Sequence, residues 1–126
     1  MSLLLKSGNI GKIELKNRVV MPPMCMYKSD NSGELKDFHF YHYISRALGG
    51  VGLIVVEATA IEPKGRISSN DLGLWDDSLI EKHKQLNKDI HSFGAKTAIQ
   101  IAHAGRKSTV IDSTPIAPSS IAFSKE

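Results

Sequence analysis

VGLIVVEA, residues 51–58, is a continuous apolar run with the length of one β-strand. It does not alternate between apolar and polar side chains, as a strand with one solvated face does. Unbroken apolar strands of this kind are typical of parallel sheets, in which both faces of each strand are covered. The stretch therefore predicts a parallel sheet with helices packed on it.

A helix is expected immediately before this strand, over residues 37–50. Asp37 is a plausible N-cap, and the pair Gly49–Gly50 is a plausible C-terminal stop. The apolar side chains of this segment recur at helical spacing and form one stripe. The stripe consists of Phe40, Tyr43, Ile44, Ala47 and Leu48.

A second helix is expected after the strand, over residues 76–94. Ser78 and Glu81 have the spacing of a capping box, in which each side chain bonds the other residue's backbone N–H. Gly94 is the expected end of the helix. Its apolar stripe consists of Leu79, Leu86, Ile90 and Phe93.

Two further strands and a hairpin complete the pattern. RVVMP, residues 18–22, predicts a short buried strand that ends at the prolines, since proline donates no ladder hydrogen bond. KTAIQIA, residues 96–102, predicts another strand. Residues 8–16 predict a β-hairpin whose loop, Gly11–Lys12, suits a type II′ turn.

The order of these elements is hairpin, strand, helix, strand, helix, strand, which implies right-handed crossovers and a parallel sheet. A doubly wound dinucleotide-binding sheet would need a G-x-G-x-x-G turn after its first strand, and residues 22–27 read PPMCMY instead. Long loops after the strands, at residues 59–75 and 103–120, favour a (β/α)₈ barrel. Such a barrel needs about 250 residues. We therefore expect an α/β fold in which residues 1–126 form the N-terminal part of a single barrel domain, incomplete in this chain.

The composition is that of an ordinary globular protein. Of the 126 residues, 41% are hydrophobic and 23% are charged, and the net charge is +3. The basic residues form no run, so no nucleic-acid partner is expected. No apolar stretch approaches the roughly 18 residues of a membrane span, so no membrane partner is expected. A single cysteine fits a reducing, cytoplasmic location.

Four stretches of the sequence together resemble the old yellow enzyme family, and within it the bacterial NADPH dehydrogenase branch that carries a cysteine beside its flavin. They occur in the same order and with compatible spacing, and the resemblance extends over essentially residues 8–123. The stretches are LKNRVVMPPMCMY at 15–27, HYISRALGGVGLIVVEATAI at 42–61, GRISSNDLGLWDD at 65–77 and IQIAHAGR at 99–106.

This resemblance implies an FMN-dependent NADPH dehydrogenase, or ene-reductase, built on a (β/α)₈ barrel. NADPH (or NADH) would reduce FMN at the carboxyl ends of the strands, and hydride would then pass to the C=C bond of an activated alkene such as an enone. The full-length protein would be a homo-oligomer. The implied flavin-contacting residues are Pro22, Pro23, Met24, Cys25, Ala58 and Gln100, and Tyr27 is the implied substrate contact.

Each of these residues also has a purely structural interpretation. Cys25 could be a small buried hydrophobe, and Ala58 could be small for packing alone. Gln100 places an amide in an apolar strand, where it must find a hydrogen-bond partner, which could be either a neighbouring strand or the flavin. His103 and Arg106 are interpreted as residues that order the loop after the third strand, and Arg66 as a structural residue of the loop before the second helix or a contact at the outer rim of the site.

Two rival interpretations stay open. The chain could be a non-catalytic fragment or interaction domain that keeps the sequence without the activity. It could also belong to a barrel enzyme that binds phosphate without a flavin. No catalytic set is complete within this chain, and no metal site is expected, since His39 and His42 lack further ligands nearby in the sequence.

Overall fold

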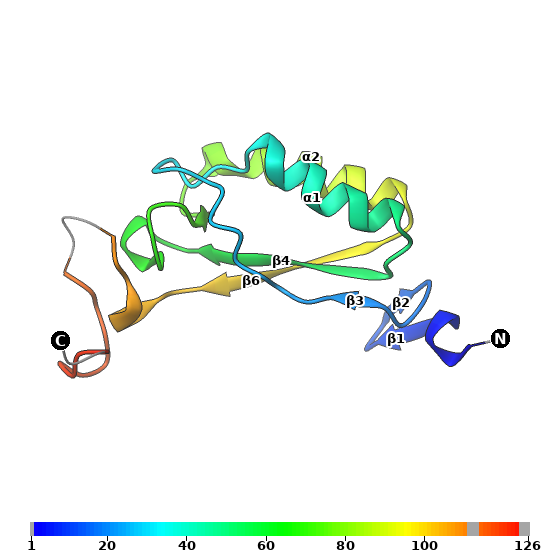
Figure 1. Cartoon of the computed structure of the whole chain (residues 1–126), viewed down its shortest axis with the longest axis horizontal. Helices are drawn as coiled ribbons and strands as arrows, with labels where there is room; N and C mark the ends of the chain where they lie inside the picture. The colour runs from blue at the N-terminus through cyan, green and yellow to red at the C-terminus, as the bar shows by residue number, and fades with distance from the viewer. Residues whose placement is uncertain (1, 111–113, 124–126) are drawn as a thin grey trace.

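The computed structural model of the chain describes residues 2–110 and 114–123 (Figure 1). Residues 1, 111–113 and 124–126 are outside the described part. The predicted domain, 1–126, and the predicted loop, 103–120, each include some of these residues, and those portions lie outside the described residues. The elements are β1 (Gly8–Ile10), β2 (Ile13–Leu15), β3 (Val20–Met21), α1 (Asp37–Leu48), β4 (Leu53–Ala60), β5 (Leu72–Gly73), α2 (Ile80–Ser92) and β6 (Lys96–Ala102).

The predicted hairpin is confirmed. β1 and β2 pair antiparallel, with Ile10 opposite Ile13 across a two-residue loop. Gly11 has a φ of 56° and Lys12 is not in the left-handed region, as a type II′ turn requires. In Figure 1 the hairpin lies at the end of the molecule from which β3, β4 and β6 start.

The predicted parallel sheet is also confirmed. β4 is central, with β3 parallel to it on one side and β6 parallel to it on the other. β3, β4 and β6 therefore lie side by side in their order along the chain, as at the beginning of a (β/α)₈ barrel. Sequence reasoning missed β5, a two-residue strand that pairs with Thr59 and Ala60 at the far end of β4.

The hydrophobic core lies between the sheet and the two helices, which cover the same face of the sheet in Figure 1. Ile54 and Val56 of β4 meet Tyr43 and Ala47 of α1 in this core, and Leu86 and Ile90 of α2 complete it. Both predicted stripes are wrong at their last residue. Leu48 is 69% exposed and Phe93 is 39% exposed, because each lies at the end of its helix and beyond the sheet contact.

Both predicted N-caps are wrong by one or two residues. Asp37 is the first residue of α1, and Lys36 is the N-cap; its backbone N–H donates to Nδ1 of His39 at 2.9 Å. Ser78 forms no capping box, because Asp76 accepts the Ser78 backbone N–H at 2.9 Å and starts a 3₁₀ turn that precedes α2. The predicted stops are confirmed at Gly49–Gly50 and at Gly94, whose φ is 73°.

Neither described helix has the length and apolar character needed to cross a membrane.

Candidate functional site at the carboxyl ends of the strands

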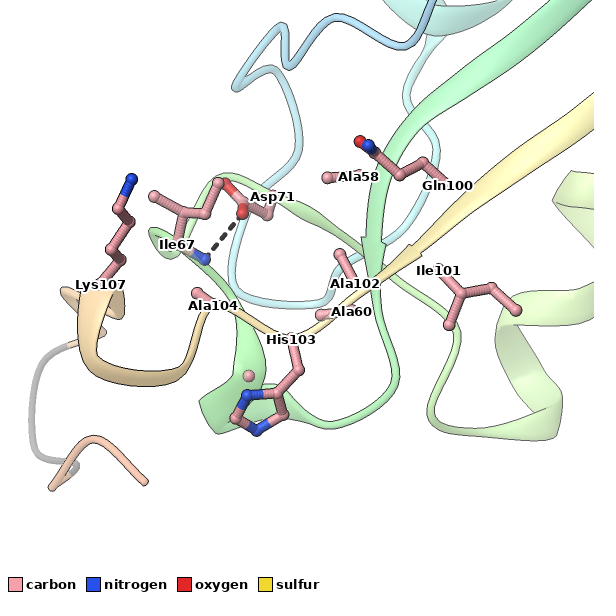
Figure 2. Close-up of a pocket in the computed structure, with 11 residues that line it drawn as sticks. Ala58, Ala60, Ile67, Asp71, Gln100, Ile101, Ala102, His103, Ala104 and Lys107 are labelled. Atoms are coloured by element: carbon pink, nitrogen blue, oxygen red, sulfur yellow. Dashed lines mark hydrogen bonds between the residues drawn. The ribbon is translucent and has the colours of Figure 1, made fainter. Parts of the chain in front are cut away.

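The carboxyl ends of β4 and β6 border a cavity of about 390 Å³. Its lining comes from the last residues of these two strands and from the loops that follow them, and includes Ala58, Asp71, Gln100 and His103 (Figure 2). Parallel strands present their carboxyl ends at one edge, which is where barrel enzymes place their active sites. The cavity therefore lies where the sequence predicts the site.

A β-bulge shapes this end of the sheet. Val56 pairs with Ile99 and Thr59 pairs with Ile101, so Glu57 and Ala58 of β4 together stand opposite the single residue Gln100 of β6. A bulge of this kind re-aims side chains and is common beside active sites. It allows Glu57 to reach helix α1 while its neighbour Ala58 lines the cavity.

Gln100 is exposed, which corrects the expectation of a buried amide. β6 pairs with β4 along one edge only within the described residues, so little covers its side chains. Figure 2 shows the Gln100 side chain reaching from β6 toward Ala58. No hydrogen bond of this amide occurs within the part of the chain that the structure describes, so its donor and acceptor groups are available to a ligand.

The segment 22–27 leaves β3 and runs beside β4 at the same end. Pro22, Met24 and Tyr27 are exposed, and Pro23 and Cys25 are half-buried. These five residues do not line the cavity of Figure 2, and only Cys25 approaches its wall, through Ala58. The structure thus places Ala58 and Gln100 together in the cavity lining. Cys25 contacts Ala58 from one side of the cavity, and Tyr27 contacts Cys25.

The Cys25 thiol lies between Ala58 and Tyr27. Burial raises the pKa of this thiol above its ordinary value, and hydrogen bonding to the Ala58 backbone and to the Tyr27 hydroxyl only partly opposes that rise. The pKa of Tyr27 is raised as well, by burial and by the nearby thiol. The thiol is therefore protonated near neutral pH and can act as an S–H donor.

Glu57 is a buried residue of this site that sequence reasoning missed. It is 1% exposed, and its Oε2 accepts the Met26 backbone N–H at 2.8 Å. Its Oε1 accepts the Tyr43 hydroxyl at 3.1 Å, and the Tyr43 oxygen in turn accepts the Glu57 backbone N–H at 3.0 Å. The one available signal was a carboxyl group inside the apolar run 51–58.

His39 lies next to this carboxyl group but is not ionised at neutral pH. Its Nε2 is 3.6 Å from Oε1 of Glu57, and burial lowers the pKa of His39 to about 4. Burial raises the pKa of Glu57, although hydrogen bonds from the Met26 backbone and the Tyr43 hydroxyl oppose the rise. Within the described residues no cluster of His, Cys, Asp or Glu could hold a metal ion.

The loop between β4 and α2 is fixed by Arg66 and Trp75. Arg66 is 5% exposed and donates to backbone oxygens of both this loop and residues 30–31. Its guanidinium lies 5.1 Å from the Trp75 ring, which packs so closely on Gly73 that a side chain there would overlap it. This confirms the structural interpretation of Arg66.

Hydrogen bonds at the cavity rim order the loop after β6. His103 Nε2 lies 2.7 Å from Oε1 of Glu62, and His103 Nδ1 accepts the Gly105 backbone N–H at 3.0 Å. Arg106 donates to the Ser119 hydroxyl at 2.9 Å. These contacts agree with loop-ordering roles for His103 and Arg106.

Comparison with known proteins gives one consistent family. The model of the NADH:flavin oxidoreductase / NADH oxidase family matches residues 4–125. A protein named NADPH dehydrogenase from Bacillus pumilus (strain SAFR-032) is 57% identical over 115 residues, which is 90% of this chain and 34% of that protein. Another NADPH dehydrogenase, from Clostridium acetobutylicum, is 53% identical over 120 residues, which is 95% of this chain and 35% of that protein.

Solved structures give the same result. Morphinone reductase superposes with a TM-score of 0.84 at 30% identity, over 94% of this chain and 32% of that one. Old Yellow Enzyme from Pichia sp. AKU4542 superposes with a TM-score of 0.78 at 30% identity, over 84% of this chain and 28% of that one. The chain therefore spans about a third of the length of the proteins it matches.

Proposed function

The chain belongs to the NADH:flavin oxidoreductase / NADH oxidase family, and from this premise we propose that it forms the amino-terminal part of an FMN-dependent NADPH dehydrogenase of the old yellow enzyme type. The full-length enzyme takes electrons from NADPH (or NADH) and reduces an activated alkene such as an enone. The observation that carries this proposal is the grouping of Cys25, Ala58 and Gln100 at the carboxyl ends of neighbouring parallel strands.

The chemistry of this grouping suits one edge of a flavin. Ala58 is small and nearly buried, so a flat ring can approach the β4 backbone closely. The Gln100 amide offers both a donor and an acceptor, which matches the polar edge of an isoalloxazine. When bound, FMN supplies the redox chemistry, and the protein positions and tunes it.

The segment 22–27 would border the flavin on the side of β3. Pro22, Pro23 and Met24 do so through their backbone, and the Cys25 S–H group modulates the electronic balance of the ring. Tyr27 is 45% exposed, and its hydroxyl, which contacts the Cys25 sulfur, is the group assigned to hydrogen-bond a substrate carbonyl.

The direct test of this function is made on the full-length protein. Purified without added cofactor, it should be yellow, release FMN on denaturation, and couple NADPH oxidation to the reduction of a simple enone such as 2-cyclohexenone. A colourless protein that FMN does not restore to activity would favour the rival barrel enzyme that binds phosphate without a flavin.

Cys25→Ala in the full-length enzyme should keep FMN bound but change the reduction potential of the flavin. The thiol contributes a single weak donor, so its loss costs little binding, while the field at the ring changes. Potentials measured by equilibration with a reference dye, and rates of the two half-reactions, check this expectation. Cys25→Ser serves as the matched control, since it keeps a donor at the same position. Unchanged potential and rates in Cys25→Ala would make Cys25 a packing residue only.

A further inference from the structure

The buried carboxyl group of Glu57 holds two other segments by hydrogen bonds, which an apolar packing residue could not do. A carboxyl group that is 1% exposed is unfavourable unless its oxygens find donors. Among the described residues no Lys or Arg side chain pairs with it, and the nearby imidazole of His39 is neutral. Its donors are instead the Tyr43 hydroxyl and the backbone of the segment that follows β3.

The segment that follows β3 has no ladder hydrogen bonds to hold it to the sheet. β3 stops pairing with β4 at Met21, because Pro22 and Pro23 have no N–H to donate. On this edge of β4, ladder pairing resumes only at Thr59, with β5. Between these two points the Glu57 side chain takes the place of a ladder bond, since its Oε2 accepts the Met26 N–H at 2.8 Å.

The attachment point is also the one strained point of the described backbone outside glycine. Tyr27 has a φ of 53°, in the left-handed region that non-glycine residues avoid. The backbone N–H of Met26, the residue before it, donates to Glu57 at 2.8 Å. The carboxyl group therefore supports the turn that points the Tyr27 hydroxyl back at the Cys25 sulfur.

We propose that Glu57 is a positioning residue that fixes segment 22–27 against β4 and thereby sets where Cys25 and Tyr27 meet the flavin. The bulge makes this possible, because it lets Glu57 bind the segment and Tyr43 while Ala58, the next residue, faces the cavity and contacts the thiol. The part of this inference that concerns the flavin rests on the proposed function. The placement of segment 22–27 by Glu57 does not depend on that function.

The test uses the full-length enzyme in its apo and FMN-loaded forms, with Glu57→Leu and the nearly isosteric Glu57→Gln. Alkylation of Cys25 by iodoacetamide is followed by peptide mass spectrometry. In the apo form Glu57→Leu should raise the alkylation rate about 10-fold or more, because thiol reactivity follows exposure and pKa. Glu57→Gln should give a smaller increase, since its amide oxygen still accepts one N–H. In the loaded form both variants should shift the visible absorption of the bound flavin.

Two control variants separate positioning from general loss of stability. Glu81→Gln makes the same change on an exposed side chain and should match the wild type in every measurement. Tyr43→Phe removes one donor but leaves the bond to Met26, so it should lower the melting temperature with little change in Cys25 alkylation.

Unchanged Cys25 alkylation in both Glu57 variants would overturn the proposal, and so would equal increases in Tyr43→Phe and Glu57→Gln. Faster alkylation with an unshifted flavin spectrum would overturn the flavin part of it. A wild-type enzyme that binds no FMN would overturn the proposed function instead, while the alkylation result still decides the role of Glu57.

Discussion

Residues 1–126 expressed alone are expected to retain no FMN and to oxidise no NADPH. In the described part of the chain, β3, β4 and β6 lie side by side and form one wall of the eight-stranded barrel. The proposed contacts from Cys25, Ala58 and Gln100 all reach one side of the flavin. Barrels usually bind phosphate at the loops after strands seven and eight, and these supply the strong, charge-assisted hydrogen bonds. Without them the affinity should fall below detection.

The isolated chain is also expected to associate. β6 has no partner on its second edge within the described residues, and Ile101 on it is 68% exposed. Unpaired strand edges of this kind template pairing with other chains. The experiment is gel filtration to remove free flavin, followed by a visible spectrum and an NADPH oxidation assay, with the full-length enzyme as control. A yellow, active and monomeric fragment would contradict both the barrel assignment and the placement of the missing groups.

Gln100→Ala in the full-length enzyme is expected to weaken FMN binding by roughly 1–3 kcal/mol, the usual cost of leaving a polar group unpaired in a dry site. The amide is exposed on the edge of the cavity and has no described partner, so the free protein should lose little when it is removed. FMN titration gives the affinity, and thermal unfolding of the apo-protein gives the stability.

The control for this variant is Gln85→Ala on the exposed face of α2, where the amide bonds only Asp89. It should change neither flavin affinity nor the spectrum of the bound flavin. If Gln100→Ala instead destabilises the apo-protein while FMN affinity holds, Gln100 is a structural amide of the sheet.

Local sequence patterns predicted the elements well where one signal dominated. The strand at 96–102 and the Gly11–Lys12 hairpin are confirmed, because an apolar run and a glycine turn have few alternatives. The helix starts were wrong where several capping residues compete within a few positions, as Asp76 and Ser78 do. β5 was missed because two residues carry no periodicity.

The site was predicted less completely, because its geometry depends on contacts between distant segments. The resemblance indicated Cys25, Ala58 and Gln100, and their roles at the flavin stay predictions. Gln100 was expected to be buried, since its strand is apolar, but exposure depends on which neighbours cover the strand. The role of Glu57 depends on Met26 and Tyr43, which come from a loop and a helix elsewhere in the chain, and on a bulge that no local pattern signals.

The adjacency of β3, β4 and β6 has a consequence for how the chain is made. A ribosome releases a protein from its amino end, and domains often begin to fold before synthesis is complete. Here β4 pairs with β3 and β6 pairs with β4, and one α-helix lies between the strands of each pair in the chain. The nascent chain can therefore add strands to its sheet in the order in which they leave the ribosome, and only the second edge of β3 has to wait for the last strand, which closes the barrel.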